Sequence, residues 1–139
     1  MRGGVGVLLV THSDVGGALL HSATQIVGQR TLHVAVLPVP PSADPTSLEN
    51  RAVELVGTMD QGAGVLVLTD IFGATPSNIA QRLTLHPRRR GRLVSGLNLP
   101  MLVRVMNYPD LDLDALAAKA YSGGHDGILA VPPITERDQ

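Results

Sequence analysis

The sequence contains no cysteine and no tryptophan. The absence of cysteine excludes disulfide bonds, thiol chemistry and cysteine-ligated zinc or iron–sulfur centres. Aromatic residues make up only 2% of the chain while 44% of its residues are hydrophobic, so the core must be built from Val, Leu, Ile and Ala. No apolar run approaches the ~20 residues of a membrane span, and the first run, cut off by His12 and Asp14, is too short for a signal peptide. We therefore expect a cytoplasmic protein.

The chain also lacks an excess of charge, with a formal net charge of -1. This balance gives no bulk attraction to nucleic acid or to an anionic membrane. The most basic stretch, residues 86–92, connects a predicted helix to the start of a predicted strand, so we expect a solvated loop. Because the 139 residues contain no internal repeat or linker, residues 1–139 are predicted to form a single domain.

What the sequence does contain is a regular alternation of apolar runs and helical patterns. Short buried runs predict five strands, at residues 5–11, 32–39, 64–70, 92–96 and 127–131. Helices are predicted between them, with caps at Asp14, Asp44, Thr75 and Asn98, and with the last helix stopped by Gly123 and Gly124. The fold class is therefore an α/β protein with an open, mostly parallel sheet and helices on both faces.

Polar residues follow three of these strands at the point where each strand ends. His12 follows the first strand, Asp70 closes the third, and Asn98 follows the fourth. Because sites in open α/β sheets form outside the carboxyl ends of the strands, these side chains are expected at one edge. A carboxylate that binds one imidazole nitrogen leaves the lone pair of the other free, so His12 could be a base, a metal ligand or a nucleophile.

The surroundings of His12 favour an anion as the ligand. The first and third strands run directly into helix starts, which present free backbone N–H groups and the positive end of the helix dipole. The segment IFGATPSN adds a glycine turn at Gly73 and the hydroxyls of Thr75 and Ser77. A phosphoryl group on or beside His12 is therefore the favoured ligand, and the spacing offers no third firm ligand for a metal ion.

Motifs of other phosphate and nucleophile sites are missing. The sequence has no GxxxxGK[ST] loop and no GxSxG elbow. The glycines of residues 3–6 precede the first strand instead of following it, so they do not form a dinucleotide fingerprint.

Three segments resemble a known family. VLLVTHSDVGGALL at the first strand, VLVLTDIFGATPSNIA at the third and SGLNLPML at the fourth look like the IIA component of the mannose family of the bacterial phosphotransferase system. The resemblance covers nearly the whole chain, from Val5 to Val131. Its most specific parts are the strand–TH junction, the D-x-F-G-x-T-P-x-N turn and the G-x-N-x-P-M-L segment.

The resemblance implies a phosphotransferase that forms a phosphohistidine. His12 would accept a phosphoryl group from the carrier protein HPr and pass it to a IIB component. Asp70 would hold the Nδ1–H of His12, so that Nε2 is the nucleophile. Helix N-terminal amides near Ser13 and Thr75, with the hydroxyls of Thr75 and Ser77, would hold the phosphoryl oxygens. No metal, nucleotide or other cofactor is implied.

The same resemblance implies supporting residues and partners. Thr11, Gly73 and Asn98 would support the site. The family is commonly dimeric, with a C-terminal strand that can exchange between subunits, and residues 127–131 would be that strand, possibly antiparallel to the rest. Contact with the membrane would be indirect, through IIC and IID components.

Two positions depart from the family's pattern, and three other functions stay open. Family members often carry glycine directly after the histidine, where this chain has Ser13, and Gly-Ala-Thr replaces the commoner Gly-Gly-Ser or Gly-Gly-Thr. A dihydroxyacetone kinase phosphocarrier subunit shares the fold and a strand-end histidine, and a regulatory protein would use the phosphorylation of His12 to control a partner. In a small-molecule binding module, His12 and Asp70 would only bind the ligand. Phe72, the only phenylalanine, is either an exposed contact for a partner or part of the core.

Overall fold

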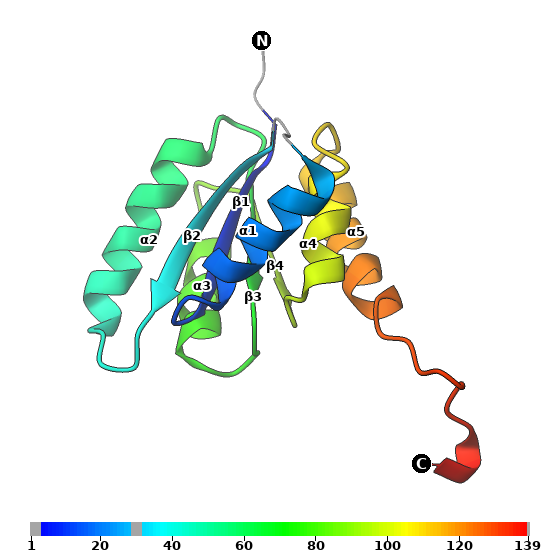
Figure 1. The fold of residues 1–139 in the computed structure, drawn as a ribbon. Coiled ribbons are helices and arrows are strands. Elements are labelled where there is room, and N and C mark those ends of the chain that lie inside the picture. The colour runs from blue at the N-terminus through cyan, green and yellow to red at the C-terminus, as the bar shows by residue number, and fades with distance from the viewer. Residues whose placement is uncertain (1–3, 29–31, 139) are drawn as a thin grey trace.

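The computed structural model describes residues 4–28 and 32–138 and contains a four-stranded sheet (Figure 1). Its strands are β1 (Gly6–His12), β2 (His33–Val39), β3 (Val65–Thr69) and β4 (Gly91–Ser95). All the pairings are parallel, in the order β2-β1-β3-β4. This confirms the predicted parallel α/β fold, and the ends of these strands lie within one residue of their predicted positions.

Helices cover both faces of this sheet. The described part of the chain contains α1 (Val15–Val27), α2 (Pro45–Met59), α3 (Thr75–Thr84), α4 (Leu99–Met106), α5 (Leu113–Asp126) and a short 3-10 turn, Glu136–Asp138. Helices α1, α4 and α5 pack on one face and α2 and α3 on the other (Figure 1). The arrangement brings the amino ends of α1, α2, α3 and α4 to the edge where the strands end.

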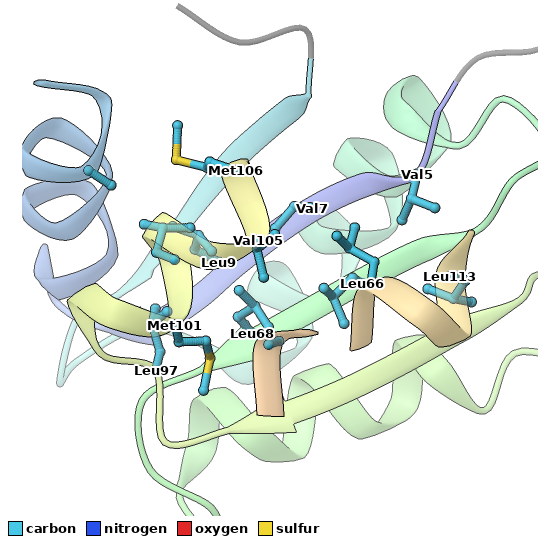
Figure 2. Packing of buried hydrophobic residues seen from close by; sticks show 14 residues of the cluster. Val5, Val7, Leu9, Leu66, Leu68, Leu97, Met101, Val105, Met106 and Leu113 are labelled. Atoms are coloured by element: carbon cyan, nitrogen blue, oxygen red, sulfur yellow. The ribbon is translucent and has the colours of Figure 1, made fainter. Parts of the chain in front are cut away.

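The alternation of side chains along β1 explains why a continuous apolar run forms this central strand. Val7 and Leu9 join the cluster under α1, α4 and α5, which Figure 2 shows, whereas Leu8 and Val10 join the cluster under α2 and α3. Successive residues of a strand point to opposite faces, so a strand covered on both sides needs apolar residues at every position. His12 lies at the exposed end of this buried run.

Two of the four predicted helix caps are confirmed. The Asp44 carboxylate accepts a hydrogen bond from the Ser47 N–H at 3.2 Å, and the Asn98 side chain accepts one from the Met101 N–H at 2.9 Å. Each is followed by a proline in the first turn of its helix, as the sequence pattern suggested.

The other two cap predictions are confirmed only in part or are wrong. Asp14 occupies the predicted cap position of α1, but its side chain makes no capping hydrogen bond, and the Thr11 hydroxyl accepts from the Gly16 N–H at 2.8 Å. Helix α3 begins one residue earlier than predicted, with Ala74 at its cap position and Thr75 as its first residue. In α1 the acceptor comes from the preceding strand, which the local pattern of the helix does not reveal.

The predicted end of the last helix is also wrong, since α5 continues through Gly123 and Gly124 to Asp126. Both glycines are buried against α4. A Cβ atom on Gly123 would lie 2.8 Å from the Arg104 Cβ, and one on Gly124 would lie 2.8 Å from the Met101 Cε. These glycines allow a close approach of two helices, so their lack of a side chain serves packing and does not end the helix.

Residues 127–131 do not form the predicted fifth strand within this chain. Gly127 caps α5, residues 128–130 have no regular structure, and the segment extends away from the body of the molecule (Figure 1). Ile128, Leu129 and Val131 are exposed. A strand exists only where it pairs with a neighbour, and the described part of the chain offers this segment no pairing.

Candidate functional site

The structure brings His12 and Asp70 together at the ends of the adjacent strands β1 and β3. The His12 Nδ1 lies 3.0 Å from the Asp70 Oδ2, and the His12 backbone N–H donates to the same oxygen at 3.0 Å. The second carboxylate oxygen, Oδ1, accepts the Ile71 N–H at 3.1 Å. When Nδ1 carries the proton, it is donated to Asp70, and the lone pair of Nε2 remains available.

The two members of this pair differ in exposure and in their electrostatic surroundings. The His12 side chain is 47% exposed, whereas that of Asp70 is 12% exposed. Burial raises the pKa of Asp70, but hydrogen bonds from the backbone and ring of His12 and the attraction of its charge outweigh that effect, so the pKa lies below the ordinary 3.8. The carboxylate is therefore ionised at neutral pH and lies where it can orient the imidazole.

Ser13 makes the turn from β1 into α1. Its φ angle is 43°, in the left-handed region that favours glycine, and its N–H donates to the Val39 carbonyl at 2.9 Å. The turn explains physically why glycine would suit the position that follows the histidine. Serine adopts it here at a modest cost in strain.

Thr11 supports the same turn from beneath. It is fully buried, and its hydroxyl accepts the Gly16 N–H at the amino end of α1. A Cβ atom on Gly16 would lie 3.1 Å from that hydroxyl, so the close approach of helix and strand needs glycine at this position. Sequence reasoning missed Gly16, although the pair Gly16–Gly17, four and five residues after the histidine, was a visible signal.

The turn between β3 and α3 is held by an internal hydrogen-bond pair. Gly73, with φ 91°, donates its N–H to the Ser77 hydroxyl at 2.7 Å, and that hydroxyl donates to the Ala74 carbonyl at 2.9 Å. The Ser77 side chain is fully buried. Its only hydroxyl proton is committed to the turn, so Ser77 braces the loop and does not face a ligand in this conformation, contrary to the sequence-based expectation.

Thr75 and Asn98 take different positions relative to the pair. Thr75 is exposed at the start of α3, and its hydroxyl makes no hydrogen bond within the residues that the structure describes. Asn98 follows β4, with β3 between it and β1, and its amide is used up by capping α4 and by donating to the Gly124 carbonyl at 3.2 Å. Asn98 therefore ties α4 to α5 and does not contact the histidine.

The open question about Phe72 is answered by its exposure. Its side chain is 63% exposed, and that of the neighbouring Ile71 is 60% exposed, so neither belongs to the core. Both follow directly after Asp70.

The donor set of the site suits an anion better than a cation. No group of three or more His, Cys, Asp or Glu side chains arranged to bind a metal occurs among the described residues. Within residues 4–28 and 32–138, the first-turn N–H groups of Val15 and Gly17 in α1 and the Thr75 hydroxyl make no hydrogen bond to the protein. Donors without partners near an oriented imidazole can hold the oxygens of an anion placed on Nε2.

Fold and site together define a class of protein first: an open, parallel α/β protein with an exposed strand-end histidine that is oriented by the carboxylate of the next strand. The family model described as the PTS system fructose IIA component, EIIA-man, matches residues 6–120. The chain belongs to this family of IIA components of the phosphotransferase system, which as a class are phosphotransferases, and the resemblance seen in the sequence is thereby confirmed.

Relatives with assigned roles agree with the family. The chain is 27% identical over 129 residues to the mannose-specific EIIAB component of Escherichia coli strain K12, covering 91% of this chain and 39% of that protein. It is 29% identical over 103 residues to the fructose-specific EIIA component of Bacillus subtilis strain 168, covering 74% of this chain and 69% of that protein. The chain thus spans about two fifths of the length of the mannose-specific relative.

Solved structures agree as well. The mannose/sorbose-specific IIA subunit from Enterococcus faecalis superposes with a TM-score of 0.80 at 25% identity, covering 97% of this chain and all of that one. Component EIIA from Streptococcus agalactiae gives a TM-score of 0.80 at 24% identity over 92% of this chain and 98% of that one, which supports the fold. Among the described residues, no helix has the length and apolar character needed to cross a membrane.

Proposed function

We propose that this protein, acting as a single IIA domain, carries a phosphoryl group on the Nε2 of His12, accepts it from phospho-HPr and passes it to a IIB component. The observation that carries the proposal is the bond between the His12 Nδ1 and the Asp70 carboxylate, which leaves Nε2 as the free nitrogen of a half-exposed imidazole. The residue assignments follow the family resemblance, and the geometry of the pair supports them.

Each transfer exchanges one N–P bond for another. The Nε2 lone pair of His12 attacks phosphorus as the bond to the donor imidazole breaks, and the displaced electron pair returns to that imidazole. The proton on Nδ1 stays in place and is donated to Asp70. As positive charge develops on the His12 ring, the nearby carboxylate stabilises it, and the reverse order of events delivers the group to IIB.

Positioning supplies the rest of the catalysis. Phosphoryl transfer between two imidazoles passes through a loose transition state, which mainly needs alignment and stabilisation of the equatorial oxygens. We assign that stabilisation to the first-turn amides of α1 after Ser13 and to the Thr75 hydroxyl at the start of α3, while Thr11, Gly73 and Ser77 hold the two turns.

Incubation with phosphoenolpyruvate, enzyme I and HPr, followed by intact mass measurement, tests the proposal. Wild-type protein should gain the mass of one acid-labile phosphoryl group, and the His12→Ala variant should gain none. The control is His21→Ala, because His21 lies in α1 and no carboxylate of the described residues is bonded to it, so this variant should be phosphorylated normally. Phosphorylation that survives the loss of His12 would remove the basis of the proposal.

The homodimer forms part of the same proposal. β4 has a pairing partner on one side, β3, and its other side borders a hollow of about 220 Å³ lined by residues of β4, α4 and α5, together with Ile128. The exposed apolar segment 127–131 from a second subunit would cover that edge. Light scattering should therefore give a dimer for the full chain and a monomer for a chain that ends at Asp126.

A further inference from the structure

The carboxylate of Asp14 lies at the amino end of α1, two residues after His12, without a bonding partner. Its side chain is exposed and makes no hydrogen bond or ion pair with the residues that the structure describes. A Cβ atom on Gly17, in the first turn of α1, would overlap this carboxylate. The Asp14 side chain is therefore folded against the same turn whose free N–H groups we assign to the phosphoryl oxygens.

Backbone geometry explains why this aspartate does not bond to its helix. Three other side chains, those of Asp44, Asn98 and Asp112, accept a first-turn N–H, and all three residues have extended backbones, with ψ angles of 120°, 171° and 173°. Asp14 instead has φ -97° and ψ 21°, and it follows Ser13, whose φ is 43°. A cap residue needs an extended backbone to direct its side chain to the N–H groups of the helix. The tight turn from β1 into α1 therefore leaves the Asp14 carboxylate at the helix end without a bond to it.

The segments that connect the strand ends to the helices offer no cation to neutralise Asp14. They contain no lysine or arginine, and they are residues 12–15, 40–44, 70–75 and 96–98. A phosphoryl group on His12 would add about two negative charges at this edge of the sheet. Like charges that lie close together raise the free energy of the state that contains them both.

We infer that Asp14 raises the phosphoryl-transfer potential of phosphorylated His12. Its carboxylate is favoured at the positive end of α1 while His12 is free, and it repels the phosphoryl oxygens when they reach the same first turn. The phosphorylated form is destabilised relative to the free form, so the group passes on more readily to the next acceptor. The inference rests on the proposed function and leaves its step unchanged: one N–P bond forms as another breaks, and Asp14 forms no bond.

The equilibrium constant for phosphoryl transfer between HPr and this protein measures the transfer potential. It is obtained by mixing dilute protein with a limiting amount of phospho-HPr and measuring both phosphorylated fractions by intact mass once they no longer change. In dilute solution this constant does not depend on how the two proteins dock, so a change in it reports the free and phosphorylated forms alone. Asp14→Asn should shift the constant about threefold to tenfold towards the phosphorylated form of this protein.

Asp110→Asn is the matched control for the change in net charge. Asp110 is exposed and has no bonding partner among the described residues. It lies in the loop after α4, where the Pro109 carbonyl lies close to Gly4, just before β1, so it is at the amino end of the sheet. The equilibrium constant of this variant should equal that of the wild type. Added salt should narrow the difference between Asp14→Asn and wild type, because salt screens exposed charges.

A second variant changes the position of the carboxylate and keeps its charge. Gly17→Ala places a methyl group where the Asp14 carboxylate lies, so this flexible side chain must move away from the first turn, while the Gly17 N–H is kept. The equilibrium constant should shift in the same direction as in Asp14→Asn, by about twofold or more. In the Asp14→Asn background, Gly17→Ala should add no further shift, because the charge is already absent.

The contrary outcomes separate this inference from the proposed function. An unchanged equilibrium constant in Asp14→Asn, even with an altered rate of transfer, would overturn the inference while His12 remains the phosphorylated residue. Equal shifts in Asp14→Asn and Asp110→Asn, or a shift that salt does not reduce, would overturn it as well. A wild-type constant in Gly17→Ala would contradict the position of the carboxylate. A wild-type protein that phospho-HPr does not phosphorylate would overturn the proposed function and this inference together.

Discussion

The two ends of the parallel sheet carry charge in opposite ways. At the amino end three arginines are paired: Arg89 lies 3.8 Å from Asp60, while Arg90 and Arg92 lie 3.8 Å and 2.9 Å from Asp114. At the carboxyl end the His12–Asp70 pair leaves the imidazole half exposed, and several donors nearby lack a protein partner within the described residues.

This difference separates charges that bond within the protein from groups that remain available to a ligand. The Asp60 carboxylate also accepts hydrogen bonds from the N–H groups of Gly62 and Gly64, so it stabilises the loop before β3. Basic residues that are this conspicuous in the sequence therefore stabilise a turn, as expected for the solvated loop 86–92. His12 and Asp70 are less conspicuous in the sequence, yet the His12 imidazole remains accessible to a ligand.

The largest expected difference between the two ends of the sheet is in the rate of phosphoryl transfer after substitution of an aspartate. Asp70→Asn keeps the shape of the side chain but removes the charge that stabilises the developing imidazolium, so transfer from phospho-HPr should slow by about 100-fold or more. Rapid quench-flow sampling followed by intact mass measurement gives the rate. Asp114→Asn, at the opposite end, should transfer at the wild-type rate, and equal slowing of both variants would contradict the contrast between the two ends.

A smaller effect is expected on stability from the support beneath the turn. Thr11→Val removes the acceptor of the buried Gly16 N–H and should lower the free energy of unfolding by about 1–3 kcal/mol, measured by urea denaturation. Thr58→Val, which loses a hydroxyl bonded to the Leu55 carbonyl on the exposed end of α2, is the control and should stay within about 0.5 kcal/mol of wild type. An equal loss of unfolding free energy in both variants would mean that the bond from Thr11 to Gly16 contributes no more than a surface hydrogen bond.

The pH dependence of stability provides a third way to test the Asp70 interaction. Because the pKa of Asp70 is lowered in the folded protein, its contribution is fully present above the unfolded value of 3.8 and is lost as the pH falls through the lower folded value. The difference in unfolding free energy between wild type and Asp70→Asn should therefore shrink as the pH drops below 3.8. A difference that stays constant across that range would show that the carboxylate gains nothing from His12.

The smallest effect concerns the strained turn. Ser13→Gly removes the left-handed strain but increases the freedom of the unfolded chain, so the two changes should cancel to within about 0.5 kcal/mol. Ser13→Val should be less stable than Ser13→Gly by about 1 kcal/mol or more, since a β-branched residue is poorly tolerated at positive φ. Thermal unfolding of the two variants side by side checks this order, and the reverse order would refute the strain.

Prediction from sequence worked best where one local signal controls one feature. The buried runs located β1 to β4, because a strand covered on both faces must be apolar throughout, and Asp44 and Asn98 followed by proline located two helix starts correctly. The pairing of His12 with Asp70 was also predictable, since parallel strands end at one edge and β1 and β3 are neighbours.

The failures share one cause, which is that the deciding contact comes from elsewhere in the chain. Gly123 lies inside α5, where α4 packs closely against it, and the Gly16 amide at the start of α1 is bonded by Thr11 of the preceding strand and not by Asp14. Ser77 looked like an exposed hydroxyl, yet the fold buries it and commits its proton to the turn. Residues 127–131 have the composition of a strand but no neighbour to pair with.

The sequence by itself determined the α/β order of elements, the family and the pairing of His12 with Asp70, because apolar periodicity and short motifs encode these locally. Only the tertiary structure decided which polar groups remain free. A hydroxyl or an amide becomes available to a ligand when no other part of the protein satisfies it, and that depends on every segment that packs nearby. For this reason only the structure shows that Ser77 and Asn98 bond to the protein's own backbone and that Phe72 is exposed.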